Sequence, residues 1–558
     1  MGVPESGLST SSAASEVTSS KDEGNRVAGG LESNASAQNL DVEPVIEQKK
    51  PFKFKLTIFM LCFISVVVAM DSVIVASMLP AITVALKGTS LEAFWVGISY
   101  LLAQTVTIPL YGTISDIFGR KWAMVFAILV FLFGSILCGS AQDMNWLIAA
   151  RVVQGLGGGG CLSLASVIIS DITTLRERPK FLAMGAFAWA LGMNIGVPVG
   201  GAIGEFSSWR VVFWINIPIC VIGTAGLIYA LHLYQEISSL RSKLARIDYL
   251  GMGIFVASTT LMLCGLTTGG TTHPWKSASV LAPLILGFTG LGVFVLVEWK
   301  VAKAPMVPIR IFSNRTANAG YFGAFIHGLV LWSFTYYLII FFLGARRDAL
   351  FKSSAETLPG RPVLLISFPN SCADISPAPP VALSAVFCNI WVAKTLRFQK
   401  MTWPAWVFLT SGTGLNALMK PDSNAGILYG LRVIAATGGG WLFQLPIFAV
   451  QSTTVNDDLG IATEGITFFR SVGQAFGVAI GGIPLALMKL SGHFPEHVIS
   501  AYRYVYADSL RTVWYVTTWI AAAGFLVSFL VKNESMDRGQ QSKQAFNSQH
   551  KEKKADEV

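Results

Sequence analysis

Charged side chains are scarce in this chain of 558 residues: only 13% are Asp, Glu, Lys or Arg, whereas 53% are hydrophobic. A soluble domain carries about a quarter charged residues. Half that fraction, over this length, leaves too little polar surface to face water. The scarcity argues against a soluble enzyme or binding module, and it predicts an all-α membrane protein whose main partner is the lipid bilayer.

Cysteine is sparse as well. The seven cysteines show no paired spacing, and most lie in apolar runs, where a cysteine is usually a small buried hydrophobic residue. We therefore predict no disulfide framework, no metal site and no cofactor. The net charge of +9 is interpreted as basic loops at a membrane surface, not as a surface for nucleic acid.

Large apolar side chains are almost absent from residues 1–50, which are rich in Ser, Glu, Gly and Ala. Such a segment cannot bury enough surface to offset its chain entropy, so we expect a disordered tail. It also has no apolar stretch of its own that could act as a cleavable signal peptide. The polar segment 533–558 is expected to be a second disordered tail.

Long apolar runs recur between the two tails. About 20 apolar residues in a helix span the hydrocarbon core of a bilayer. By this criterion the sequence predicts fourteen helices, at residues 54–79, 94–115, 122–140, 146–169, 181–204, 211–233, 250–268, 281–299, 318–343, 378–393, 404–419, 427–450, 465–488 and 512–531.

Basic residues predict the orientation of these helices. They gather in alternate loops, for example around Arg120, Arg178 and Arg241, and are few in the loops between. Because cytoplasmic loops carry the excess of Lys and Arg, both termini are expected in the cytoplasm. Residues 344–380 depart from the pattern, with several basic residues and prolines in a predicted outer loop. They form either an extended outer loop or, by hypothesis, a segment that is partly translated intron or another gene-model error.

One short loop carries a specific pattern of charge and glycine. It lies between the second and third predicted helices and contains Gly112, Asp116, Gly119, Arg120 and Lys121. A basic anchor would explain the two cations but not the acid framed by two glycines. The loop resembles the signature loop of the major facilitator superfamily, with Ile117 in place of the usual first arginine. The resemblance implies that the loop latches two halves of a transporter and that Asp116 lies near a helix N-terminus of the second half.

Further motifs resemble those of the drug:proton antiporter branch of this superfamily. They are Met70–Pro80 in the first helix, Arg151 to Gly157 in the fourth, and Trp209 to Pro218 at the start of the sixth. The resemblance implies a tail at 1–50, an N-terminal six-helix bundle at 51–233, two additional helices at 234–317, a C-terminal six-helix bundle at 318–532 and a tail at 533–558. It also implies alternating access by rocking of the bundles.

The fifth helix departs from the branch's motif. It keeps the glycines, but its proline stands one place late; the motif residues are Gly192, Gly196, Pro198, Gly200 and Gly201. Small residues let helices pack closely and a proline can bend a helix, so we expect a packing surface here. The shifted proline leaves the position of the bend, and antiport as against uniport, open.

Two buried ionisable residues are the main functional candidates. Asp71 lies within the first helix and Arg151 within the fourth, and an ionisable group among membrane helices is costly enough to suggest a function. One interpretation is that the two residues simply satisfy one another. The other is that Asp71 exchanges a proton when its surroundings alternate, while Arg151 tunes its charge and Gln154 offers hydrogen bonds.

Weaker candidates could line a central cavity: Gln104, Asn194, His327 and Gln444. The predicted function is proton-driven export of small amphipathic compounds, such as drugs or toxins, by a monomer in the plasma membrane or the vacuolar membrane. The alternatives are uptake or uniport of a sugar or an iron chelate. A membrane receptor or enzyme is a different class, which no nucleophile constellation or nucleotide motif supports.

Overall fold

We describe the chain from a computed structural model. It describes residues 51–174, 176–233, 247–270, 272–302, 305–345, 380–454, 458–479 and 496–532, together with Arg241, Leu244 and Glu534. The two predicted tails and most of the irregular segment 344–380 lie outside these residues. Every statement below concerns the described part of the chain.

The first six helices follow the predicted order closely. They are α1 (Phe52–Ala85), α2 (Ser90–Phe118), α3 (Arg120–Gly139), α4 (Met144–Ile172), α5 (Arg178–Phe206) and α6 (Val211–Ala230). Local sequence fixes their ends. Thr89 and Glu92 form a capping box at the start of α2, and the Asp143 carboxylate accepts the amide of Trp146 at the start of α4. Gly119 separates α2 from α3 with a φ of 95°, which a residue with a side chain rarely adopts.

The remaining helices are α8 (Tyr249–Thr268), α9 (Ala278–Lys300), the short η1 (Ile309–Phe312), α10 (Arg315–Ile340) and the π-helical η2 (Phe341–Ala345), followed by α12 (Pro380–Thr395), α13 (Gln399–Leu415), η4 (Asn416–Leu418), α14 (Ala425–Leu442), α15 (Leu445–Gln451), α16 (Leu459–Ala479) and α18 (Glu496–Ser528). Each predicted range overlaps one of these helices.

Several boundaries differ from the prediction; α1, for example, continues to Ala85, six residues beyond the predicted end at 79. The predicted helix 427–450 is divided into α14 and α15 at Phe443 and Gln444, just before Pro446. A proline has no amide hydrogen and disrupts the preceding turn, which accounts for the break. α16 begins six residues before the predicted start at 465, and α18 begins at Glu496 and not at 512.

The described helices have the length and surface of membrane spans. Nine described segments, one of which runs through α14 and α15, are long and apolar enough to cross a bilayer. Large apolar side chains stand outward on their surfaces, for example Trp122, Phe126 and Phe133 on α3, which are 56–58% exposed. Exposed apolar surface of this extent is unfavourable in water and favourable in lipid. The prediction of an all-α membrane protein is therefore confirmed.

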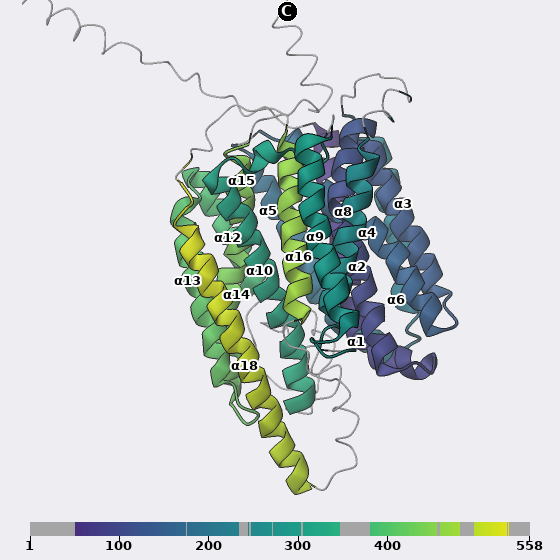
Figure 1. The fold of residues 1–558 in the computed structure, drawn as a ribbon, viewed down its shortest axis with the longest axis vertical. Helices are drawn as coiled ribbons and strands as arrows, with labels where there is room; N and C mark the ends of the chain where they lie inside the picture. Colours follow the sequence, from purple (N-terminus) through teal and green to yellow (C-terminus); the bar gives the residue numbers. More distant parts are fainter. Residues whose placement is uncertain are drawn as a thin grey trace, which may run out of the picture. The chain divides into compact units, whose positions relative to one another are not determined.

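The helices pack mainly within two groups. In the first, α1 packs on α5 and α6, and α4 packs on α2 and α3; in the second, α16 and α18 pack on α10, and α13 packs on α14 and α18 (Figure 1). Contacts also join the groups, because α16 packs on α2 and α4, and α12 packs on α5. The helices α8 and α9 pack on each other, and α8 also contacts α2 and α16. The exact division at residues 233 and 317 stays a prediction.

Glycines permit close approach between α1 and α5. A Cβ at Gly192 would overlap the backbone carbonyl of Val66, and one at Gly196 would crowd Met70. Gly200 and Gly201 are also buried in α5, whereas nothing is described of the side chain of Pro198. The first two glycines therefore lie where the predicted packing surface requires them, although the functional role of the motif stays a prediction.

We expect Gly192→Ala to destabilise the protein. The added methyl group meets backbone that cannot move aside, and overpacking of this kind costs about 1–3 kcal/mol. Thermal unfolding of the detergent-solubilised protein would show a lower midpoint. The matched control is Gly253→Ala on α8, where no atom lies within 4 Å of the added Cβ. Equal midpoints for the two variants would contradict the close approach of α1 and α5.

Candidate functional site

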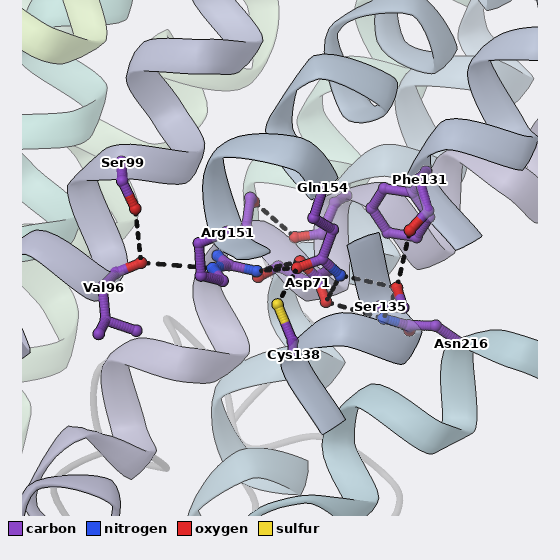
Figure 2. A network of polar contacts seen from close by, with 11 residues as sticks. Asp71, Val96, Ser99, Phe131, Ser135, Cys138, Arg151, Gln154 and Asn216 are labelled. Atoms are coloured by element: carbon purple, nitrogen blue, oxygen red, sulfur yellow. Dashed lines mark hydrogen bonds and ion pairs between the residues drawn. The ribbon is translucent and has the colours of Figure 1, made fainter. Parts of the chain in front are cut away.

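Asp71 is wholly buried in α1 and forms an ion pair with Arg151 of α4. The Nη1 atom of Arg151 lies 2.5 Å from Oδ2 of Asp71, and neither side chain is exposed (Figure 2). The two residues lie 80 positions apart in sequence, so the fold, not local structure, brings them together. The predicted proximity of the two charges is thus seen in the structure.

The second carboxylate oxygen of Asp71 is also occupied. Oδ1 accepts hydrogen bonds from the Gln154 side-chain amide at 3.0 Å and from the Asn216 side-chain amide at 2.8 Å. Both amides also donate to the hydroxyl oxygen of Ser135 on α3. Figure 2 shows the side chains of Gln154, Ser135 and Asn216, which come from α4, α3 and α6, around Asp71. Sequence reasoning placed Gln154 here but did not assign a role to Asn216 or Ser135.

Arg151 has further partners of its own. Its Nη1 donates to Oε1 of Gln154 at 2.7 Å, and its Nε donates to the carbonyl of Val96 on α2 at 3.3 Å. The guanidinium also stands 4.2 Å from the ring centre of Tyr100, a distance typical of a cation–π interaction. A buried ion pair is tolerated when such additional bonds satisfy its remaining atoms. The geometry thus agrees with mutual satisfaction of the two charges, while proton exchange at Asp71 stays a prediction.

A second group of charges lies at the turn between α2 and α3. Arg120 pairs with Asp116 at 2.5 Å and, through Nε, with Asp171 of α4 at 2.9 Å. Its Nη1 also donates to the hydroxyl of Ser115 and, at 3.5 Å, to the carbonyl of Gly112. Arg120 is only 4% exposed. One arginine therefore ties the end of α2 to the end of α4.

Lys121 does not take part in this group. Its Nζ donates to the carbonyl of Ile228 in α6 at 2.7 Å. Arg120 and Lys121 are adjacent basic residues, but their side chains thus have different surroundings. Lys121 meets the exposed end of another helix, whereas Arg120 is buried between two carboxylates.

The α2–α3 turn faces the first turns of α16. A Cβ at Gly112 would overlap the carboxylate of Glu464, and one at Gly460 would overlap the Nη2 atom of Arg120. The resemblance implies that Asp116 lies near a helix N-terminus of the second half. Asp116 does interact electrostatically with Asp458, the residue before α16, and Arg120 approaches Gly460 in its first turn. Sequence reasoning missed Asp171 and Glu464, which lie 51 and 344 positions beyond Arg120.

Two glutamine side chains form further hydrogen bonds between the groups of helices. Gln451 donates to the hydroxyl of Ser170 on α4 at 3.0 Å, and Gln444 donates to the carbonyl of Leu182 on α5 at 3.0 Å. Gln444 also lines a cavity of about 50 Å³ between α4, α5 and α16, together with Arg470 and Gln474. Gln444 thus lines a small cavity, and its place at a central substrate cavity stays a prediction.

The other predicted cavity residues are placed differently. Gln104 and His327 are buried but are not among the residues that line this cavity, and His327 instead contacts the carbonyl of Gly439 through Nε2 at 2.9 Å. Nothing is described of the side chain of Asn194. Arg470, which lines the cavity, donates to the carbonyl of Phe443 at 2.5 Å, at the break between α14 and α15.

A larger cavity of about 640 Å³ lies between α8, α9, α10 and α16. Pockets for small organic ligands are typically about 300–1,000 Å³. The larger cavity has the required size, whereas the cavity of about 50 Å³ lined by Gln444 does not. Its wall is almost entirely apolar and aromatic. An all-helical membrane protein with buried charges inside its helix groups and cavities between them has the architecture of a transporter.

Comparison with known proteins agrees with that class. Residues 61–358 match the Major Facilitator Superfamily. MFS transporter L2 of Phoma sp. is 31% identical over 544 residues, which cover 92% of this chain and 88% of the relative. The efflux pump FUS6 of Gibberella fujikuroi is 28% identical, over 89% of this chain and 93% of the relative. The chain therefore belongs to the major facilitator superfamily, as the sequence motifs implied.

The fold is also found in solved structures. The proton:xylose symporter XylE aligns with a TM-score of 0.56 at 9% identity, over 88% of this chain and 98% of that chain. The human organic anion transporter MFSD10 (TETRAN) aligns with a TM-score of 0.52 at 12% identity, over 86% and 100%. At these identities the likeness concerns the fold alone, and it confirms the predicted fold class.

Proposed function

We propose that this transporter exports small amphipathic organic compounds by proton antiport. Several fungal relatives bear the name efflux pump, among them LUC4 of Fusarium sp. at 29% identity over 87% of this chain. The observation that carries the coupling to protons is the buried ion pair of Asp71 and Arg151 with Gln154. An ionisable group kept inside a membrane bundle at such cost marks an ion pathway more often than a structural contact.

Asp71 would carry the proton. As a carboxylate it accepts three hydrogen bonds and balances the charge of Arg151. On protonation it loses that charge, and Arg151 is left as a buried cation whose charge is no longer balanced. Such a cation is costly, so rearrangement of α1 against α4 becomes favourable. A change in protonation thereby biases one arrangement of the helices over another, which is what coupling requires.

The charges at the α2–α3 turn would act as the gate. Arg120 holds α2 and α4 together and contacts Gly460 of α16, so this end of the molecule is closed between the two helix groups. We place this end and both chain termini in the cytoplasm, because basic residues gather in the loops at this end.

The assembly we propose is a monomer in the plasma membrane, with two six-helix bundles and the pair α8–α9 between them.

The proposal is tested with the purified protein in lipid vesicles. Load the vesicles with a fluorescent amphipathic dye, impose a pH gradient, and follow the movement of the dye. We expect the gradient to drive transport in the wild type, and Asp71→Asn, compared at an equal amount of folded protein, to reduce the gradient-dependent part to the level of protein-free vesicles. The matched control is Asp508→Asn, because the Asp508 side chain is 69% exposed.

The outcomes separate the alternatives. Transport that is saturable but indifferent to the gradient would contradict antiport and would indicate facilitated movement, as for a uniporter. Gradient-dependent transport that survives Asp71→Asn would remove Asp71 from the coupling and leave it as a structural partner of Arg151. Accumulation of a sugar or an iron chelate with the proton gradient, in place of dye export, would overturn the proposed direction and cargo.

A further inference from the structure

The large cavity beside the pair α8–α9 is lined by aromatic side chains from four helices. Phe255 comes from α8, Phe294 from α9, Phe325 from α10, and Phe468 and Phe476 from α16. The ring centre of Phe255 lies 5.3 Å from the ring centre of Phe294 and 5.3 Å from that of Phe468. Rings at such spacing offer both faces and edges to a flat apolar ligand.

Among the described residues that line the cavity, one buried polar atom has no hydrogen-bond partner. Glu464 of α16 lines the cavity, is only 2% exposed, and its Oε1 has no hydrogen-bond partner in the described part of the chain. Glu298 also lines the cavity, but its two carboxylate oxygens accept the amides of Met306 and Val307 at 3.2 and 3.3 Å. The carboxylate of Glu298 thus holds the segment after α9 in place, whereas Oε1 of Glu464 can still accept a hydrogen bond from a ligand.

The nearest cation does not neutralise Glu464. Arg120 acts on Glu464 electrostatically, but its guanidinium already pairs with Asp116 at 2.5 Å and Asp171 at 2.9 Å. Arg178, the other cation near Asp171, donates to the carbonyl of Ser170. Two arginines therefore face three carboxylates. A buried carboxyl group in surplus favours either a proton or a cationic ligand.

We propose that this cavity binds a lipophilic compound that carries a protonated amine, with Glu464 as its counter-ion and the aromatic residues around its apolar body. The proposal deepens the proposed function and rests on it, since it names the class of cargo. Its parts agree in size and chemistry: about 640 Å³ suits a drug-sized molecule, and aromatic rings attract cations as well as apolar groups.

The rim of the cavity lies on an exposed apolar surface. Phe288, Val295 and Phe322 line it and are 54%, 52% and 40% exposed. In a membrane protein, side chains of this kind face lipid. A lipophilic amine dissolved in the bilayer would therefore reach the cavity sideways, from the lipid, between α9 and α10. Glu464 also lies against Gly112 of the charged turn, so the bound amine would stand next to the gate.

The test compares two probes that differ only in charge. A dansyl group on a five-carbon alkylamine carries a cation, and its N-acetylated form does not. Titrate each into the purified full-length protein in lipid nanodiscs, without any gradient, and follow the dansyl fluorescence. We expect the wild type to bind the amine about tenfold more tightly than the acetylated form, the factor that one charge-assisted hydrogen bond supplies. Glu464→Gln should bring the two affinities within about twofold.

Aromatic variants test the location of the site. Phe468→Ala should weaken both probes, because it removes a ring from the lining, whereas Phe387→Ala on α12 should leave them unchanged. Should Glu464→Gln fail to fold, Phe322→Cys keeps Glu464 intact: the amine probe should slow alkylation of this cysteine, and the acetylated probe should slow it less.

Three results would overturn the proposal: equal affinity for both probes in the wild type, as for a cavity that simply holds a lipid chain; a charge preference that survives Glu464→Gln; or alkylation of Phe322→Cys that the amine does not slow. Binding is measured here without transport. If the protein binds the amine but the pH gradient does not move it, the proposed function is contradicted and the proposed binding site still holds. If Glu464→Gln loses the preference for the amine but still exports the dye, both the proposed function and the proposed binding site still hold.

Discussion

Replacing Arg151 with methionine is expected to leave little folded protein. The substitution removes the charge partner of Asp71 and leaves a carboxylate wholly buried among apolar helices. Breaking a buried ion pair from one side costs about 3–5 kcal/mol, a large part of the stability of a typical domain. Fluorescence-detected size-exclusion chromatography after solubilisation, together with thermal unfolding, would measure the loss.

The double variant Asp71→Asn/Arg151→Met separates structure from coupling. It removes both charges and keeps two neutral side chains of similar size, so most of the stability should return. If Asp71 couples transport to protons, the restored protein should still lack the gradient-driven component. A double variant that folds and exports in response to the gradient would reduce the pair to a structural role, and one that is no more stable than Arg151→Met would contradict the proposed charge balance.

Replacing Arg120 with alanine is the second change with a large expected effect. Arg120 is the shared partner of Asp116 and Asp171, and without it these two carboxylates and Glu464 would lie close together with their mutual repulsion unscreened. We expect the transport rate to fall at least about tenfold, which corresponds to about 1.4 kcal/mol. The vesicle assay under a fixed pH gradient would measure it.

The neighbouring lysine provides the matched control. Lys121→Ala removes a cation of the same loop, but one whose bond is to the carbonyl of Ile228 at an exposed position. Its effect on the rate should be within about twofold, since exposed contacts of this kind contribute little. Similar losses in the two variants would mean that the loop acts through its overall positive charge and not through the buried contacts of Arg120.

Most of the fold could be predicted from the sequence, because the bilayer imposes a simple rule on composition. Apolar runs long enough to span lipid identify helices without knowledge of their neighbours. The rule fails where polar residues continue a helix beyond the apolar run. α18 begins at Glu496, and its N-terminal half contains Arg503, Asp508 and Arg511, charged residues that precede the apolar run predicted from 512. The break before α15 is also not predicted, because Pro446 stands within a continuous apolar run.

The site was predicted less completely. Asp71, Arg151 and Gln154 could be selected because polar residues in an apolar run are conspicuous and a family motif contains two of them. Asn216 and Ser135 are equally polar and equally buried, but their part depends on which faces of α6 and α3 turn toward Asp71, and helix rotation is set by packing. Glu464 was missed for a similar reason, since only the tertiary fold brings it beside Gly112.

The break between α14 and α15 has a consequence for how the molecule changes shape. In an uninterrupted helix the carbonyl of Phe443 would accept the amide of Ile447. Here the amide of Ile447 donates to the carbonyl of Gln444, and the guanidinium of Arg470 donates to the carbonyl of Phe443. Straightening the segment would bring the Ile447 amide to the carbonyl oxygen that Arg470 now occupies, so the two donors would share one acceptor. The bend is therefore linked through Arg470 to the small cavity that Arg470 and Gln444 line.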